Sequence, residues 1–253
     1  MAVNQMISKL VDGLYPPVCV LCGESGQAGH NNQGKYTAAA DICRACQQDL
    51  VQNEPACYQC GIPLSAAGNN PRLCCADCLQ SPPCFTRTLA PYLYQWPLDR
   101  LVQAFKFQGD LTVGRMLAGL IQGNIEKLAN AAVPDAIIPI PLHRSRQQQR
   151  GFNQAALLAA DLAKGLNIPL RENILLRGKP RLPQVELDAK ARKKNIRGVF
   201  ALDARVAKLP AHVALVDDVM TTGSTLSEAA RILLERGVER VDCWVIARAP
   251  KPG

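Results

Sequence analysis

The sequence predicts an α/β domain built on a parallel sheet, preceded by a small cysteine-rich module. Ten of the eleven cysteines lie before residue 85, and only Cys243 lies after it. The rest of the chain alternates short aliphatic runs with stretches that have apolar residues at helical spacing, which is typical of buried parallel strands covered by helices. We therefore expect a cysteine-rich domain over residues 1–86 and an α/β domain over residues 87–253.

Length and charge narrow the classes of protein to consider. A chain of 253 residues with 48% hydrophobic residues can bury one large core and carry a smaller module beside it. The formal net charge of +8 favours anionic partners such as diphosphates or nucleic acid. No apolar run reaches the roughly 18 residues of a membrane span, and the first residues lack the pattern of a signal peptide. We expect a soluble, cytoplasmic protein.

Four pairs of cysteines have the two-residue spacing that places two thiolates on one tight turn, as in zinc ribbons. They predict two structural Zn²⁺ sites, whose binding energy stabilises the fold. A disulfide framework is disfavoured by the reducing cytosol and by the repeated spacing. The ligands are Cys19, Cys22, Cys43, Cys46, Cys57, Cys60, Cys75 and Cys78.

The spacing alone leaves the pairing of these four turns open. Consecutive turns or interleaved turns would each give two tetrads, and we expect the consecutive arrangement. Cys74, which adjoins Cys75, is an alternative ligand in the same register. Cys84 and Cys243 have no partner cysteine nearby, so we expect both to be small buried side chains.

Two segments of the α/β domain read as a strand followed by a polar loop and a helix. The first has a strand at 136–140, a loop that begins at Pro141, and a helix that ends near Lys164. The second has a strand at 212–216, a loop, a helix at 226–236 and a further strand at 241–246. Ligands of parallel sheets bind beyond the carboxyl ends of the strands, where both polar loops would lie.

The second loop has the chemistry of a sugar-phosphate site. Its hydroxyl side chains, with a glycine that lets backbone amides approach an anion at a helix start, predict a phosphate cradle made by Thr221, Thr222, Gly223, Ser224 and Thr225. Asp217 and Asp218 directly precede the cradle and suit the vicinal hydroxyls of a ribose. A simple helix cap is the plainer alternative. The chain has neither the GxxxxGK[ST] loop nor the GxGxxG loop.

Taken together, these motifs resemble the ComF/GntX family of competence and DNA-utilisation proteins. The stretch 213–225 looks like the phosphoribosyl-pyrophosphate signature of type I phosphoribosyltransferases. The resemblance also rests on the segments 140–144 and 150–154, on Gln184 with Leu187, and on Arg192 with Asn195. The four cysteine pairs are similar to the double zinc ribbon of that family, and the segment 101–109 is similar to the region before its catalytic domain. The likeness covers nearly the whole chain.

The resemblance implies a type I phosphoribosyltransferase-like parallel sheet with flanking helices, and roles for individual residues. Asp217 and Asp218 would be the catalytic carboxylates, binding ribose hydroxyls or Mg²⁺-linked waters. A pyrophosphate loop would contain Leu142, His143 and Arg144, with a cis peptide bond between Leu142 and His143 at a cost of about 3–4 kcal/mol. The basic segment 171–197 would form a hood over the site, with Gln184, Arg192 and Asn195, or else be a solvated face.

Two functions from different classes follow. The first is an enzyme, a Mg²⁺-dependent phosphoribosyltransferase (a glycosyltransferase) that uses phosphoribosyl pyrophosphate or a related sugar phosphate with an acceptor that the sequence leaves open. The alternative is a non-catalytic module that binds single-stranded DNA in the DNA-uptake machinery, beside a helicase. The resemblance implies a part in DNA uptake or utilisation under either hypothesis.

Overall fold

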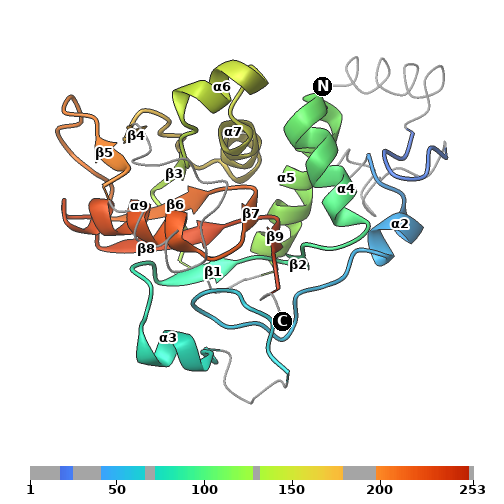
Figure 1. Cartoon of the computed structure of the whole chain (residues 1–253), viewed down its shortest axis with the longest axis horizontal. Coiled ribbons are helices and arrows are strands. Elements are labelled where there is room, and N and C mark those ends of the chain that lie inside the picture. The colour runs from blue at the N-terminus through green and yellow to red at the C-terminus, as the bar shows by residue number, and fades with distance from the viewer. Residues whose placement is uncertain (1–17, 25–40, 66–71, 128–131, 179–197, 251–253) are drawn as a thin grey trace.

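The computed structural model describes residues 18–24, 41–65, 72–127, 132–178 and 198–250. The principal sheet has four parallel strands in the order β1-β8-β6-β3. These strands are β1 (Arg87–Leu89), β3 (Ala136–Pro139), β6 (His212–Val216) and β8 (Arg240–Trp244). Figure 1 shows this sheet at the centre of the molecule. The predicted α/β class with a parallel sheet is confirmed.

Three of these strands continue beyond a break as a second parallel sheet, in the order β2-β9-β7. Its strands are β2 (Tyr92–Leu93), β7 (Val219–Met220) and β9 (Ala247–Arg248). The chain passes from β1 to β2, from β6 to β7 and from β8 to β9 with only two residues between the strands of each pair. The segment 217–218 is one of these three interruptions. A separate antiparallel pair joins β4 (Leu175–Arg177) to β5 (Phe200–Leu202).

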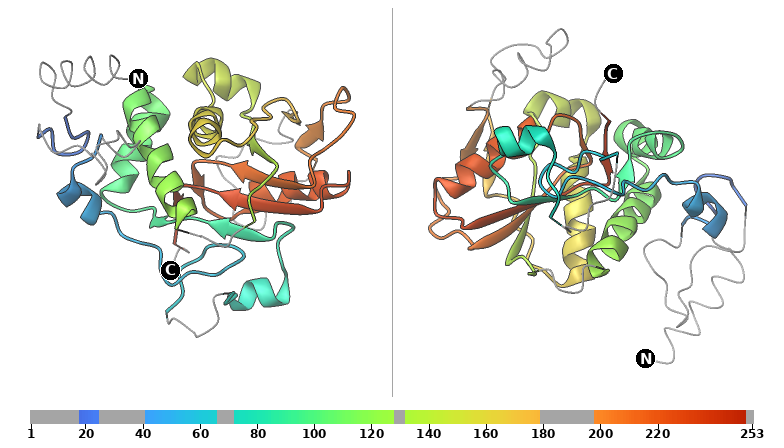
Figure 2. Two further views of the ribbon diagram at one scale, coloured as in Figure 1. Left: turned by 180° about the vertical axis from the view of Figure 1, so that it is seen from behind. Right: turned by 90° about the horizontal axis from the view of Figure 1, so that it is seen from below.

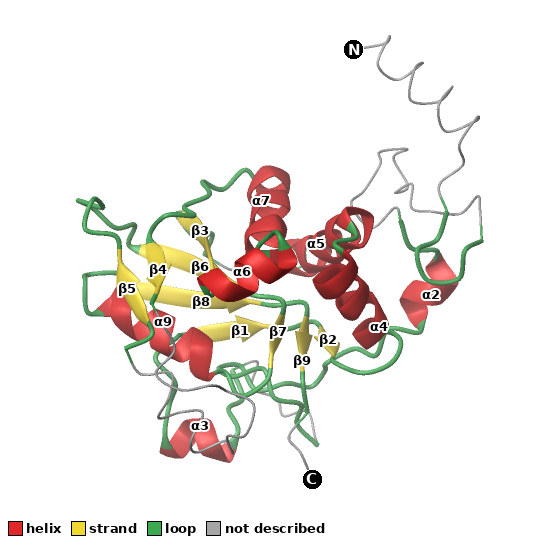
Figure 3. Ribbon diagram, turned by 45° about the horizontal axis from the view of Figure 1, so that its top comes forward, coloured by secondary structure: helices red, strands yellow, loops and turns green. Residues whose placement is uncertain are grey.

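Helices cover both faces of the principal sheet, as Figure 3 shows. One face packs against α5 (Leu111–Glu126) and α7 (Gln154–Leu166), and the other against α9 (Ser224–Leu234). The side chains of β6 alternate accordingly. Ala214 and Val216 belong to the core under α5 and α7, whereas Val213 and Leu215 belong to the core under α9. This alternation is what a strand that is buried on both faces requires.

The remaining helices are short. They are α2 (Arg44–Gln48), α3 (Ala76–Gln80), α4 (Leu98–Gln103), the π-helical segment η1 (Ala104–Gln108) and α6 (Arg144–Arg150). In Figure 1 α2 lies beside α4, and α3 lies below β1. Both views in Figure 2 keep α2 and α3 well apart. Among the described residues, no helix has both the length and the apolar composition that crossing a membrane requires.

The main helices and strands were predicted from the sequence, but some predicted helix boundaries differ from the observed ones. α9 begins at Ser224, two residues earlier than predicted, because Gly223 adopts a left-handed conformation (φ 75°) that starts the helix directly after the loop. Apolar spacing first becomes visible at Leu226, so it cannot reveal that start. The polar helix α6 was not predicted, since the pattern used for prediction depends on buried residues and the segment 145–149 is exposed.

A buried ion-pair cluster links neighbouring strands of the principal sheet. The carboxylate of Asp242, on β8, is fully buried and lies 2.9 Å from the Arg87 guanidinium on β1 and 3.0 Å from that of Arg240. The imidazole of His212, on β6, is 3.2 Å away. The cluster therefore links three neighbouring strands. A buried carboxylate is tolerated only when such partners surround it.

We expect Asp242→Ala to lower the free energy of unfolding by about 3–5 kcal/mol, because it leaves the cluster's cations without their counter-charge. Urea denaturation of the zinc-loaded protein measures this change. Glu235→Gln is the matched control: its ion pair with Arg231 lies on the exposed surface of α9, where a loss below about 0.5 kcal/mol is expected. Equal losses in the two variants would contradict the role of the cluster.

Candidate sugar-phosphate site and zinc ribbons

The two predicted carboxylates occupy the break between β6 and β7. The amide of Asp217 donates to the carbonyl of Trp244 (3.2 Å), and the amide of Ile246 donates to the carbonyl of Asp218 (3.0 Å). Both hydrogen bonds join this backbone to the neighbouring segment 244–246. Asp218 is buried and Asp217 is partly buried. The structure brings them together at the carboxyl end of the central strands, where ligands of parallel sheets bind.

A lysine that the sequence analysis did not select neutralises this pair. The Lys106 ammonium lies 2.8 Å from a carboxylate oxygen of Asp218, and both side chains are largely shielded from solvent. Lys106 belongs to η1, a π-helical segment of a kind that often marks functional sites. The side-chain amide of Gln154, buried at the start of α7, donates to the Lys106 carbonyl (3.2 Å).

Packing of η1 on α5 explains how Lys106 reaches the carboxylates. Phe105 is fully buried, and its ring lies directly against Gly114 of α5. A Cβ atom at position 114 would come within 2.6 Å of that ring, so only glycine allows the close approach. Lys106, the next residue of η1, reaches the Asp218 carboxylate from this position. Phe105 and Lys106 together join the helical layer to the site.

Desolvation in the strand break raises the pKa of Asp217 to about 7, and the adjacent carboxylate of Asp218 acts in the same direction. The charges of Lys106 and Arg177 act in the opposite direction. Arg177, at the end of β4, is itself half-buried, donates to the carbonyl of Pro141 (3.3 Å) and stacks on the Phe200 ring. The site therefore contains a carboxyl group that titrates near neutral pH, together with two cations.

The predicted phosphate cradle forms the N-terminus of α9. The Thr222 and Ser224 hydroxyls hydrogen bond to each other (2.9 Å), and the Ser224 amide donates to Thr222 Oγ1 (3.3 Å). The first hydrogen bond within the helix runs from the Ser227 amide to the carbonyl of Gly223. The amides of Thr225 and Leu226 precede it and are available to an anion. Thr221 and Thr222 are exposed at the loop surface.

The loop after β3 lies beside this cradle, because β3 and β6 are in register and the Ile140 amide donates to the carbonyl of Val216 (2.9 Å). His143 is the N-cap of α6: its Nδ1 accepts from the Ser145 amide (3.3 Å). Leu142 precedes it in the loop, and Arg144 is the first residue of α6. The predicted loop is therefore next to the carboxylates, although its contact with a pyrophosphate stays a prediction.

The prediction of a cis peptide bond between Leu142 and His143 is wrong. Both cis bonds in the described part of the chain precede proline, at Pro55 and Pro97. His143 has the extended backbone of an N-cap (φ −64°, ψ 140°), so a trans bond leads directly into α6. Without contacts that compensate about 3–4 kcal/mol, a cis bond is not favoured here. Gln184, Arg192 and Asn195 of the predicted hood lie outside the described residues.

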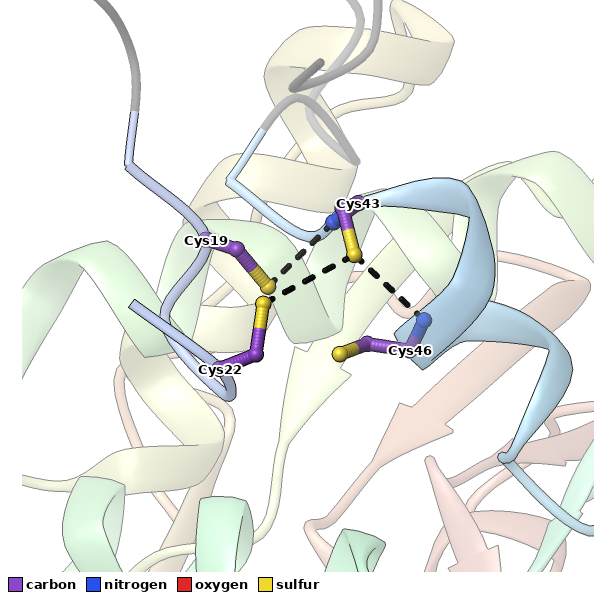
Figure 4. Close-up of side chains that lie close together, drawn as sticks. All are labelled: Cys19, Cys22, Cys43 and Cys46. Atoms are coloured by element: carbon purple, nitrogen blue, oxygen red, sulfur yellow. Dashed lines mark hydrogen bonds between the residues drawn. The ribbon is translucent and has the colours of Figure 1, made fainter. Parts of the chain in front are cut away.

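The eight predicted cysteine ligands form two tetrads, each made of consecutive turns. Cys19, Cys22, Cys43 and Cys46 make the first tetrad (Figure 4), and Cys57, Cys60, Cys75 and Cys78 make the second. Within each tetrad the sulfurs lie within 4.8 Å of one another. This is the consecutive arrangement that we expected.

The sulfur positions fit tetrahedral zinc. Four Zn–S bonds of about 2.3 Å place sulfurs roughly 3.8 Å apart. The separations are 3.9 Å between Cys22 and Cys43 and 3.7 Å between Cys60 and Cys75, far longer than the roughly 2.05 Å of a disulfide. Backbone amides also donate to the sulfurs, as the Cys43 amide does to Cys19 (3.3 Å; Figure 4) and the Cys75 amide to Cys57 (3.3 Å). Such donors stabilise thiolates.

Of the three other cysteines, Cys243 and Cys84 were both predicted to be buried, and only Cys243 is. Cys243 is buried in the sheet, as predicted, and its burial raises the pKa of its thiol. Cys84 is exposed, so the prediction of a buried side chain is wrong for it. It lies in the connection before β1, where its amide donates to the Ser227 hydroxyl (3.2 Å) and the backbone holds it at the surface. Cys74 is outside both tetrads.

Comparison with known proteins finds two family models that match different parts of the chain. The family model described as "Double zinc ribbon domain" matches residues 10–79, and the one described as "Phosphoribosyl transferase domain" matches residues 153–252. The α/β fold is accordingly of the phosphoribosyltransferase type and follows a cysteine-rich double zinc ribbon.

Three curated relatives extend the match over most of the chain. Competence protein F of Haemophilus influenzae is 37% identical over 224 residues, 87% of this chain and 96% of that protein. DNA utilization protein YhgH of Salmonella typhimurium is 35% identical over 210 residues, 82% and 90% of the two chains. Competence protein ComFC of Bacillus subtilis is 26% identical over 245 residues, 92% and 95%. The chain belongs to the ComF/GntX family.

Proposed function

We propose that this chain binds phosphoribosyl pyrophosphate, or a related ribose phosphate, at the carboxyl end of β6. One observation carries the proposal: the carboxylates of Asp217 and Asp218 lie in a break of the sheet and are followed at once by a hydroxyl-rich loop that opens α9. Carboxylates suit vicinal hydroxyls, and a helix start with hydroxyl side chains suits a phosphate. A ribose 5-phosphate presents both groups.

The same residues fit Mg²⁺, which prefers oxygen ligands and keeps several of its waters. Asp217 and Asp218 would hold those waters or the ribose hydroxyls, and the metal would neutralise the diphosphate. The diphosphate itself would lie toward the loop at 141–144, which adjoins the end of β6. Lys106 would exchange its contact with Asp218 for a phosphate oxygen, because both are anions within reach of one flexible ammonium.

A site of this kind supports transfer of a phosphoribosyl group. The bond from the sugar to pyrophosphate breaks as the acceptor bonds to the same carbon, and the charge that develops on the ribose and on the leaving group needs fixed counter-charges. The carboxylate pair, Lys106 and Arg177 supply them, and the loop amides hold the 5-phosphate. The protein contributes positioning and neutralisation, and the acceptor stays open.

The names of the relatives point to the cellular setting of this activity. They are described as competence and DNA utilisation proteins, so we propose that the site serves the uptake or use of DNA. Single-stranded DNA and an uptake helicase remain predicted partners. The formal net charge of +8 is compatible with a nucleic acid partner.

Isothermal titration of phosphoribosyl pyrophosphate with Mg²⁺ into the zinc-loaded protein tests the proposal. We expect binding by the parent and at least a tenfold loss of affinity, roughly 1.4 kcal/mol or more, in the Asp217→Asn, Asp218→Asn double variant. Neutral amides accept less strongly than carboxylates from ribose hydroxyls and from Mg²⁺-bound waters. Unchanged zinc content and unfolding temperature establish that the variant is folded. Absence of binding by the parent would refute the proposed function.

The raised pKa of Asp217 makes affinity depend on pH. If its ionised form binds the ligand, the affinity should rise roughly tenfold between pH 6 and pH 8, as a group with a pKa of about 7 loses its proton. The folded state binds this proton more tightly than the unfolded chain does, whose ordinary value is 3.8. The shift therefore lowers stability as pH rises from about 4 to 7 and cannot explain tighter binding. Asp217→Asn should remove this part of the pH dependence, and only the ligand's own titration should remain.

Lys106→Met tests the neutralising role of the lysine with a side chain of similar length. Removing the cation should move the midpoint of the pH profile upward, since the ammonium holds the Asp217 pKa down. Affinity at pH 7 should also fall. The control is Lys164→Met. Lys164 lies in the last turn of α7, so this change should leave the pH profile of affinity unchanged. An unaltered midpoint in Lys106→Met would argue that the ammonium does not influence the carboxylates.

A further inference from the structure

One buried arginine contacts both the second zinc tetrad and the phosphate cradle. Arg248 lies on β9 and is only 5% exposed. Its Nε donates to the carbonyl of Cys60 at 2.9 Å. Its Nη1 donates to carbonyls on the other side: those of Met220 (3.1 Å), Thr221 and Ala249 (2.7 Å). A single guanidinium therefore joins segments that are far apart in the sequence.

The two ends of this contact belong to the second cysteine tetrad and to the loop before α9. Cys60 is a ligand of the second tetrad, and Thr221 begins the hydroxyl loop. The planar guanidinium has donors in a fixed geometry, so a shift of one carbonyl partner changes the hydrogen bonds available to the others. β9 also pairs with β7, which places Met220 opposite Arg248 in register. The arginine thus holds the base of the loop at a fixed distance from the zinc-binding turn.

Charge reinforces the link. A zinc ion with four thiolates carries a net double negative charge, and a buried cation nearby offsets it. Loss of the tetrad would leave the buried guanidinium with carbonyl partners alone.

The second ribbon is also fixed to the sheet by other contacts. The side-chain amide of Asn53 donates to the carbonyls of Gly61 (2.8 Å) and Ala90 (2.9 Å), and the Thr88 amide donates to the carbonyl of Tyr58 (3.1 Å). The first tetrad lies elsewhere: Cys19 and Cys46 pack in the core with residues of α4 and α5. Figure 3 shows α2 of the first ribbon beside α4, away from the start of α9.

We propose that Arg248 couples zinc occupancy of the second tetrad to the conformation of the phosphate cradle, so that zinc and the sugar phosphate stabilise each other's sites. Zinc in the second tetrad holds the Cys60 carbonyl, Arg248 holds the loop through that carbonyl, and the ordered loop amides receive the phosphate. By reciprocity, a bound phosphate should slow the release of zinc from the second tetrad and not from the first. The ligand half of this inference rests on the proposed function.

Hydrogen exchange of the full-length protein, followed in the peptide that covers residues 220–226, tests the coupling without any ligand. Cys60→Ser removes a zinc ligand but keeps the carbonyl that Arg248 contacts. We expect this variant and Arg248→Met each to speed exchange of the hydrogen-bonded amides of this peptide, such as that of Ser224, by about tenfold or more. Arg248→Lys, which keeps the charge but not the fork, should lie between them and the parent. Cys22→Ser is the matched control, because it disrupts the first tetrad and should leave these amides unchanged.

A second measurement reads the same coupling through zinc. In the Cys22→Ser background, a chromogenic chelator reports release from the second tetrad, and Arg248→Met should accelerate that release. Saturating phosphoribosyl pyrophosphate with Mg²⁺ should slow release when Arg248 is present and have no effect in Arg248→Met.

The outcomes separate the two proposals. Loop exchange in Cys60→Ser equal to that of the parent would overturn the coupling, as would ligand that binds by titration yet leaves zinc release unchanged. Failure of the parent to bind any sugar phosphate would refute the proposed function, and the exchange experiment would still decide the role of Arg248.

Discussion

The break in three adjacent parallel strands is the constraint on which the site depends. The chain is interrupted between β6 and β7, between β8 and β9 and between β1 and β2, and Asp217 and Asp218 occupy the interruption after β6. Two neighbouring carboxylates in a partly desolvated position repel each other and favour protonation. The fold can keep them there only if cations lie close by. Lys106 supplies the closest one, at 2.8 Å from Asp218.

The position of Lys106 is in turn a property of the helical layer. Phe105 packs against Gly114 in α5, and the side-chain amide of Gln154 in α7 donates a hydrogen bond to the Lys106 carbonyl. The π-helical hydrogen bonding of η1 adds a residue to the turn and so changes the direction in which successive side chains point. Core packing of α5 and α7 thus determines the electrostatics of a site on the opposite side of η1.

Local patterns explain which features were predictable. The buried strands at 136–139 and 212–216, the hydroxyl loop and the cysteine pairs each depend on residues that are close in sequence. Arg248 was not predicted, while Lys106 and Arg177 were included only within the segments 101–109 and 171–197 and without roles of their own. Their partners are distant along the chain, and a lone basic residue has no local signature. The cis bond at Leu142 was taken from the family likeness alone, and the exposed position of Cys84 depends on a connection without regular structure.

The two zinc ribbons differ in the kind of contact that each makes with the rest of the fold. The first tetrad contributes apolar surface: Cys19 and Cys46 belong to the same core as Leu101 and Phe105, on the side from which Lys106 approaches. The second tetrad contacts the sheet through polar groups, above all the Cys60 carbonyl that Arg248 binds. Zinc binding fixes short segments that have little regular structure of their own. The first ribbon therefore shares a core with the segment that carries Lys106, and the second contacts the loop at Thr221 through Arg248.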